Sequence, residues 1–199
     1  MKREKDWIPR YPMKFLHKVF NHPGLRRILG KVRLLLGIVC IILIMIYGRF
    51  ELYFLAFAVS FFGELIQIWA SSSLEKNEVL TVRGPYSLIR NPMYLGRFLV
   101  ILGGIILLYN IYIILFYVVV YYFYMVNRVT REERQLEELF GEPYQEYRSK
   151  VNRFIPNLKI YEEGEPLFFR FHILFRNNEH FNFLALLSFY IVFYFFHNT

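Results

Sequence analysis

The stretch FLVILGGIILLYNIYIILFYVVVYYFYMV, residues 98–126, decides the fold of this 199-residue chain. Asn110 is its only clearly polar residue and divides it into two apolar runs, residues 98–109 and 111–126. Such runs suit hydrocarbon, which a helix crosses at about 1.5 Å per residue. An isolated strand could not cross, because its backbone N–H and C=O groups would find no partners in lipid. The pattern therefore predicts two membrane helices joined by a tight turn at Asn110.

Three further apolar stretches lie outside this hairpin. They are residues 34–47, residues 52–70, which contain Glu64 and Gln67, and residues 181–196. With 56% hydrophobic and 20% aromatic residues, the chain is more apolar than a soluble domain, which excludes a secreted or cytosolic globular protein. We predict an all-α fold, a polytopic membrane helix bundle of about five transmembrane helices.

The distribution of Lys and Arg predicts the orientation of the bundle. Ten of the 24 lie before residue 34, and an internal N-terminus leaves only Arg49 outside the cell. The turn at Asn110 and the C-terminus are then external. Because the basic residues flank apolar runs, the net charge of +8 indicates membrane phospholipids as partners and no nucleic acid.

The sequence also predicts three regions. Residues 1–33 form a basic juxtamembrane segment that is too long and too basic for a signal peptide. Within it, residues 13–32 read as a basic amphipathic helix on the membrane surface, broken at Pro23-Gly24, or as a disordered basic arm. Residues 34–166 form the membrane core, and residues 167–199 a C-terminal extension with an additional apolar helix. The single Cys40 and the lack of Cys/His clusters argue against disulfides and metal.

Polar residues gather in two cytoplasmic stretches, residues 71–96 and 127–166, which the hairpin brings together. Asn91-Pro92 reads as a helix start, with Asn91 as cap and Pro92 at the first helical position. The N–H groups of such a start suit a carboxylate or phosphate, although caps are also common in ordinary helices. In the second stretch, Arg128 and Glu132 share one helix face beside Glu133, as functional residues or as a plain surface pair.

These motifs together resemble a known family. They are Gly84-Pro85-Tyr86, Arg90-Asn91-Pro92-Met93-Tyr94-Leu95-Gly96, Glu132-Glu133, Phe140-Gly141-Glu142, Tyr144 and Tyr147. Over about residues 80–156 the chain resembles the isoprenylcysteine carboxyl methyltransferases and related phospholipid methyltransferases. It departs from their commonest motif at Asn91, where the family has a His. Asn can form hydrogen bonds but cannot titrate.

The resemblance implies S-adenosylmethionine bound at the cytoplasmic face and a lipophilic acceptor that enters from the membrane. It implies that Arg128 and Glu132 are catalytic, with Arg128 orienting an anionic acceptor. The residues assigned to the cofactor are Arg90, Asn91, Pro92, Tyr94, Gly96 and Glu133. Among these, the helix start suits the cofactor carboxylate, Glu133 its ammonium or ribose, and the Tyr94 ring its adenine or sulfonium.

Three residues remain as candidates for contact with the acceptor: Glu64, Tyr147 and Arg153. A carboxyl group within an apolar helix is costly unless it is paired or protonated. Glu64 therefore reads either as part of a substrate tunnel or as a structural partner of neighbouring helices. The stripe that contains Tyr147 is, by itself, more often packing than part of a binding site.

The predicted function is methyl transfer to an isoprenylcysteine-like carboxylate or another lipophilic acceptor. Phospholipid N-methylation is the nearest alternative, with Glu132 as the base that deprotonates an amine. An NADPH-dependent sterol-type reductase has a similar hairpin but is disfavoured. The reductase motif carries an Asn just before the Tyr and an Asp after the Gly, whereas here Met93 precedes Tyr94 and Arg97 follows Gly96. A membrane scaffold without enzymatic activity is the last alternative.

Overall fold

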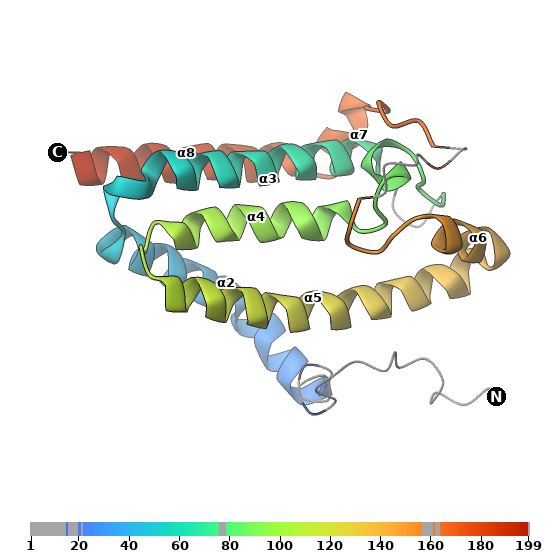
Figure 1. Cartoon of the computed structure of the whole chain (residues 1–199), viewed down its shortest axis with the longest axis horizontal. Helices are drawn as coiled ribbons and strands as arrows, with labels where there is room; N and C mark the ends of the chain where they lie inside the picture. Colours follow the sequence, from blue (N-terminus) through green and yellow to red (C-terminus); the bar gives the residue numbers. More distant parts are fainter. Residues whose placement is uncertain are drawn as a thin grey trace.

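The computed structural model describes residues 15, 20, 22–75, 79–156, 161 and 164–198, and the predicted helical bundle is confirmed there (Figure 1). The helices are α2 (Pro23–Tyr47), η1 (Phe50–Leu52), α3 (Tyr53–Ser73), η2 (Gly84–Ser87), α4 (Pro92–Ile106), α5 (Ile111–Phe140), α6 (Glu142–Lys150), α7 (Phe171–Arg176) and α8 (Glu179–Asn198). Four of them, α2, α3, α5 and α8, are long and apolar enough to cross a membrane. Helix α4 is apolar but has only 15 residues.

The hairpin between α4 and α5 turns at Asn110, as predicted. The Asn110 side chain accepts hydrogen bonds from the backbone N–H groups of Tyr112 (2.9 Å) and Ile113 (3.3 Å), so this residue caps α5. With 30 residues, α5 is about 45 Å long and exceeds the roughly 30 Å of hydrocarbon. Its last turns therefore carry Arg128 and the residues after it toward the loops at the start of α4.

Helices α3 and α4 lie side by side and approach closely at glycines (Figure 1). A Cβ added to Gly96 would lie 2.6 Å from Cγ of Gln67 and 2.7 Å from the Gly63 carbonyl oxygen. A Cβ on Gly63 would in turn lie 2.6 Å from the Gly96 carbonyl oxygen. Both glycines are therefore explained by the close contact of two helix backbones.

Helix α8 is an integral part of the bundle. Tyr190 lies between α8 and α3, where its hydroxyl is 2.8 Å from the Ser60 hydroxyl and donates to the Ala56 carbonyl at 2.9 Å. Tyr190, Ala56, Leu107, Leu186 and Phe193 form one buried apolar cluster. Although the C-terminal segment lies outside the recognised motifs, it packs along α3 at one edge of the bundle (Figure 1).

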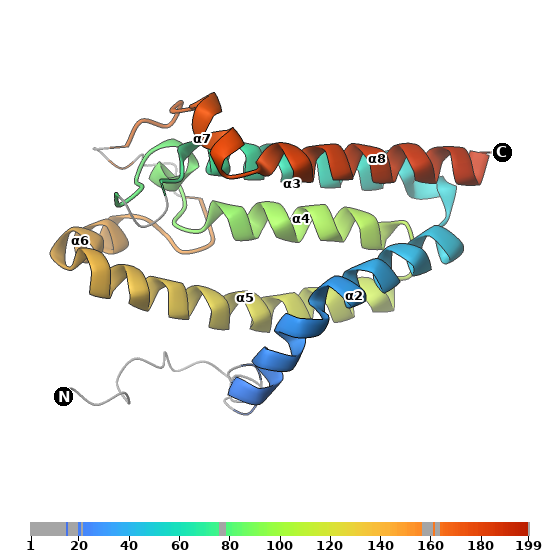
Figure 2. The ribbon, with the colours of Figure 1, turned by 180° about the vertical axis from the view of Figure 1, so that it is seen from behind.

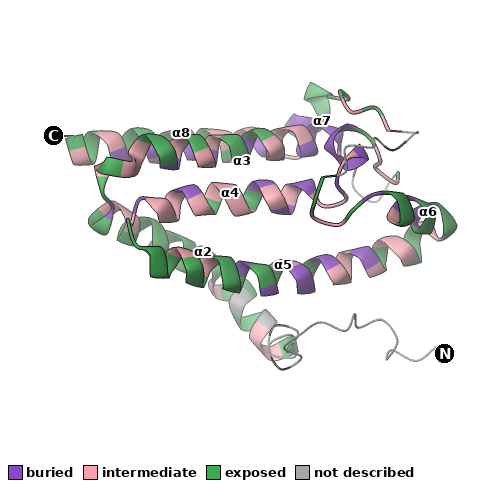
Figure 3. Ribbon diagram, viewed as in Figure 1, coloured by how far each residue is buried: buried purple, intermediate pink, exposed green. Residues whose placement is uncertain are grey.

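Helix α2 crosses the rest of the bundle obliquely and is exposed along most of its length (Figures 2 and 3). Its apolar side chains, such as Leu34 and Leu35, face outward, as expected for a helix surrounded by lipid. The predicted surface helix at residues 13–32, with its break at Pro23-Gly24, can be compared with the structure mainly from residue 22 onward. Pro23 is the first residue of α2, with His22 at the cap position, so residues 23–32 belong to the membrane helix. Residues 13–14, 16–19 and 21 lie outside the described residues.

The orientation of the bundle is testable by cysteine labelling. In a Cys40→Ser background, single cysteines at Asn110 and Thr199 are expected to react with an impermeant reagent added outside, and cysteines at Lys76 and Lys159 only after permeabilisation. The physical reason is the concentration of Lys and Arg on one side. External labelling of Lys76→Cys or Lys159→Cys would contradict the predicted orientation.

Candidate active site

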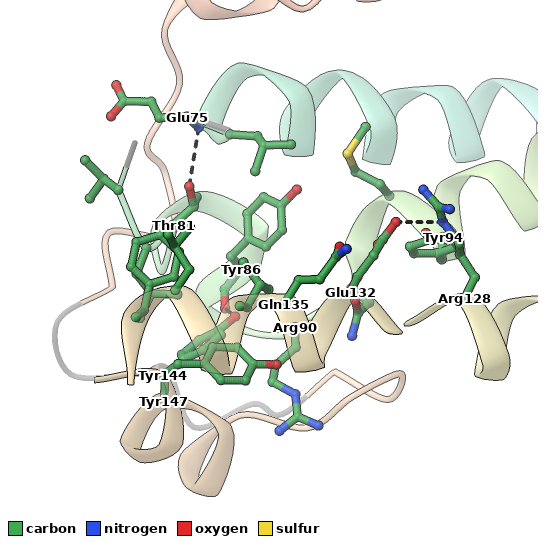
Figure 4. Close-up of a pocket in the computed structure, with 18 of the residues that line it drawn as sticks. Glu75, Thr81, Tyr86, Arg90, Tyr94, Arg128, Glu132, Gln135, Tyr144 and Tyr147 are labelled. Carbon is green, nitrogen blue, oxygen red and sulfur yellow. Dashed lines mark hydrogen bonds and ion pairs between the residues drawn. The ribbon is translucent and has the colours of Figure 1, made fainter. Parts of the chain in front are cut away.

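A pocket of about 1060 Å³ opens where the start of α4 meets the last turns of α5 (Figure 4). Residues from α2, the loop before α4, α4, α5 and α6 line it, including Arg33, Thr81, Tyr86, Arg90, Asn91, Tyr94, Arg97, Tyr124, Arg128, Glu132, Gln135, Tyr144 and Tyr147. Its volume is slightly above the roughly 300 to 1,000 Å³ that small-molecule sites occupy. The predicted neighbourhood of the two polar stretches is confirmed.

At one side of the pocket, α4 and α5 hold three polar groups in contact. Arg128 Nε donates to Glu132 Oε1 at 2.8 Å, along the same face of α5. The Tyr94 hydroxyl from α4 lies close enough to Glu132 and Arg128 to interact electrostatically with both. The side chains of Arg128 and Glu132 are 48% and 34% exposed, so both reach the pocket, as Figure 4 shows.

Tyr94 is held in place by its neighbours. Tyr121 of α5 donates to the Tyr94 carbonyl at 2.7 Å, which ties the first turn of α4 to α5. The Arg97 guanidinium lies over the Tyr94 ring, 5.8 Å from its centroid. The ring is therefore fixed between the pair of Arg128 with Glu132 on one side and a second cation on the other.

The other side of the pocket is built from buried tyrosines and Arg90. Tyr147 of α6 donates to the Tyr86 carbonyl at 2.7 Å, and Tyr144 is buried beside it (Figure 4). Burial raises the pKa of Tyr86, Tyr144 and Tyr147, so their hydroxyls stay protonated and can donate.

Two buried polar atoms at this side have no hydrogen-bond partner among the described residues. They are the Tyr144 hydroxyl and Nε of Arg90, and both residues line the pocket. Burying a polar group without a partner is costly, so such atoms mark places where a polar ligand fits.

Glu133 lies next to this pocket but does not line it. Its carboxylate is 1% exposed and is bound by Arg90 at 3.1 Å and by Arg153. Asn91 adds a hydrogen bond to Glu133 Oε1 at 3.4 Å. Three segments, the start of α4, the end of α5 and the loop after α6, are thus joined through one carboxylate.

The predicted cap at Asn91 is wrong in one respect. Pro92 is the first residue of α4, as predicted, but the Asn91 side chain makes no capping hydrogen bond. It donates instead to Glu133 and to the Arg153 carbonyl at 3.3 Å. Both bonds use the Nδ2 donor, whereas a cap uses the side-chain oxygen as an acceptor for a helix N–H. Holding the amide toward Glu133 therefore orients the side chain so that its oxygen does not cap α4.

The predicted site residues divide into two groups. Arg90, Asn91, Tyr94, Arg128, Glu132 and Tyr147 line the pocket. Pro92, Gly96, Glu133, Glu64 and Arg153 are not among the lining residues: Gly96 packs against α3, and Glu64 is buried and accepts from Gln67 at 3.1 Å. Sequence reasoning did not assign Arg33 and Arg97 to the site, because it used their charge to orient the helices and Arg97 also to disfavour a reductase. It named Tyr144 among the family-like motifs but gave it no role in the site. Among the described residues, no group of three His, Cys, Asp or Glu is placed to hold a metal ion.

Comparison with known proteins adds one finding. A family model described as phospholipid methyltransferase matches residues 25–143, which cover nearly all of α2, helices α3 to α5, the first polar stretch and the part of the second stretch up to residue 143. Comparison with curated proteins and with solved structures gave no match.

Proposed function

The chain belongs to the phospholipid methyltransferase family and is a membrane methyltransferase; we propose that S-adenosylmethionine is its methyl donor and that a lipophilic molecule from the membrane is its acceptor. The observation that carries this proposal is one pocket with two chemically different sides. Buried donors without partners lie at one side, and the exposed pair of Arg128 and Glu132 lies at the other. We further propose that the pocket faces the cytoplasm.

The residues of the buried side fit the donor. S-adenosylmethionine supplies an electrophilic methyl group on a sulfonium and also carries a carboxylate, an ammonium, ribose hydroxyls and adenine. Arg90 and the Tyr144 hydroxyl would bind its anionic and hydroxyl groups, because each has an unused buried donor there. Tyr94 would face the cationic part, since an aromatic ring attracts a cation over its face.

In this proposal Glu133 positions other residues and does not touch the donor. Its two oxygens are already bound by Arg90, Arg153 and Asn91. That network orients Arg90, whose Nη1 also donates to the Arg148 carbonyl at 2.7 Å. A carboxylate with this many partners has little capacity left for an ammonium group.

Arg128 and Glu132 are the proposed catalytic residues. An acceptor that is already a carboxylate, as in an isoprenylcysteine, needs orientation and no base, and Arg128 offers a planar pair of donors for it. An amine acceptor first loses a proton, and the Glu132 carboxylate is the group in the pocket that would take it. Tyr94 contacts both residues and would hold their geometry.

Phospholipid N-methylation is the second candidate, and the family description favours it. The two acceptors make different demands on the same pair of residues. Labelled S-adenosylmethionine supplied with N-acetyl-farnesylcysteine or with phosphatidylethanolamine would identify the acceptor, since only the true acceptor gains label.

Calorimetric titration of detergent-purified protein tests the donor. S-adenosylhomocysteine, the product of the donor, is expected to bind, and NADPH is not. Binding of NADPH alone would support a sterol-type reductase and overturn the proposal. Binding of neither ligand would support a scaffold.

Tyr94→Ala is expected to weaken S-adenosylhomocysteine binding about tenfold while the protein stays folded. The reason is the loss of a positioned ring next to the donor, an interaction worth roughly 1 to 2 kcal/mol. Tyr112→Ala, at the opposite end of α5, is the matched control and should bind like the parent. Equal affinities for all three proteins would remove Tyr94 from the donor site.

A further inference from the structure

Three helices each contribute an arginine to the pocket: Arg33 from α2, Arg97 from α4 and Arg128 from α5. Arg128 is paired with Glu132. Among the described residues, no carboxylate lies within salt-bridge distance of Arg33 or Arg97. The pocket therefore has two arginines that form no ion pair within the described part of the protein, although Glu75 and Glu138 also line it.

Arg33 and Arg97 occupy positions at which basic residues commonly contact lipid headgroups. Arg33 immediately precedes the apolar run of α2, and Arg97 lies in the second turn of α4. Both side chains are exposed. Basic residues beside apolar helix segments lie at the interfacial depth, where lipid phosphates are the abundant anions.

Arg97 is the one of these two arginines that lies close to the residues beside the proposed catalytic pair, while Arg33 lines the same pocket. The Arg97 guanidinium lies 5.8 Å from the centroid of the Tyr94 ring, and the Tyr94 hydroxyl contacts Glu132 and Arg128. An anionic group held at Arg97 would thus be one aromatic ring away from the Glu132 carboxylate. In an aminophospholipid, an ester oxygen and two carbons separate the phosphorus from the nitrogen. This spacing would direct the amine toward Glu132.

We propose that Arg33 and Arg97 bind the phosphate of the acceptor and so select a phosphate-bearing lipid. Guanidinium groups match phosphate oxygens with paired donors, and their hydrogen bonds are stronger because both partners are charged. The claim that Arg33 and Arg97 select the acceptor rests on the proposed function. The claim that they bind a lipid phosphate does not depend on it.

The test uses full-length protein in detergent and dihexanoyl phosphatidylethanolamine as the probe. The variants are Arg33→Gln, Arg97→Gln and their combination. Arg27→Gln is the matched control, because Arg27 is an exposed arginine of the same helix α2 that does not line the pocket. Calorimetry measures the affinity for the lipid and, separately, for S-adenosylhomocysteine.

The double variant is expected to bind the lipid roughly 10 to 100 times more weakly, because charge-assisted hydrogen bonds are lost. The thermal stability of the double variant should match that of the parent. Arg33→Gln should bind S-adenosylhomocysteine like the parent, because Arg33 is not among the neighbours that hold Tyr94, and Arg27→Gln should bind both ligands normally. Unchanged lipid binding by the double variant overturns the proposal. An equal loss in Arg27→Gln also overturns it, because it shows only general attraction to basic surface charge.

A second binding experiment uses an acceptor of different chemistry. N-acetyl-farnesylcysteine carries a carboxylate and no phosphate, so its binding should be unaffected by the double variant. An equal loss for both probes would show that the arginines bind any anionic acceptor, which overturns the selection of phosphate. If the parent binds the phospholipid in an arginine-dependent way but transfers no labelled methyl group, the proposed function fails and the phosphate site stands.

Discussion

Glu133→Ala is expected to lower the free energy of unfolding by about 3 to 5 kcal/mol, the usual cost of breaking a buried ion pair. The Glu133 side chain is 1% exposed, and its partners Arg90 and Arg153 are 9% and 17% exposed. Removing the carboxylate leaves two guanidinium groups facing each other with little water to solvate them. Denaturant titration of the purified protein, followed by circular dichroism, measures the loss.

Glu132→Ala is the matched control for this experiment. The two residues are adjacent on α5, but Glu132 is 34% exposed and pairs with a half-exposed Arg128. Exposed pairs contribute about 0 to 1 kcal/mol, so Glu132→Ala should unfold almost like the parent. A Glu133→Ala protein of normal stability that no longer binds S-adenosylhomocysteine would instead support direct contact with the donor.

Arg128→Lys is expected to reduce methyl transfer by about tenfold to a hundredfold while leaving stability and S-adenosylhomocysteine binding unchanged. Lysine keeps the charge but lacks the planar pair of donors that would orient the acceptor. A misplaced acceptor is costly, because correct alignment of the reacting groups supplies much of the rate enhancement. Transfer from labelled S-adenosylmethionine to each of the two acceptors measures the effect.

A purely structural role for Arg128 predicts a different result. The pair of Arg128 with Glu132 joins residues one turn apart on a single helix and is largely exposed, so lysine would maintain it. Undiminished transfer by Arg128→Lys would remove Arg128 from the catalytic residues.

Much of the architecture could be predicted because the membrane permits few alternatives. The helical hairpin at Asn110 followed from two apolar runs and one polar residue. Its antiparallel geometry then required Arg90 and Asn91 to lie near the end of α5, where both now contact Glu133. Sequence spacing sufficed because few other connections can fold back across lipid.

The role of each acidic residue could not be predicted in the same way. Glu132 and Glu133 are adjacent, and successive residues of a helix point about 100° apart. Only one of them can face the pocket while the other faces the loop after α6. Which of the two glutamates faces the pocket depends on the rotation of α5 about its axis. The hydrogen bond from Tyr121 to the Tyr94 carbonyl helps to fix that rotation. Arg33 and Arg97 were missed for another reason, since the topology alone accounted for their charge.

The shortness of α4 has a consequence for the surrounding bilayer. Fifteen residues cover about 22 Å, which is roughly 8 Å less than the hydrocarbon thickness. Such a hydrophobic mismatch is met by local thinning of the bilayer or by a polar segment that sinks below the headgroup plane. The pocket at the start of α4 then lies at the depth where a lipid already places its headgroup. A lipophilic acceptor of the proposed kind would then react without being extracted from its leaflet.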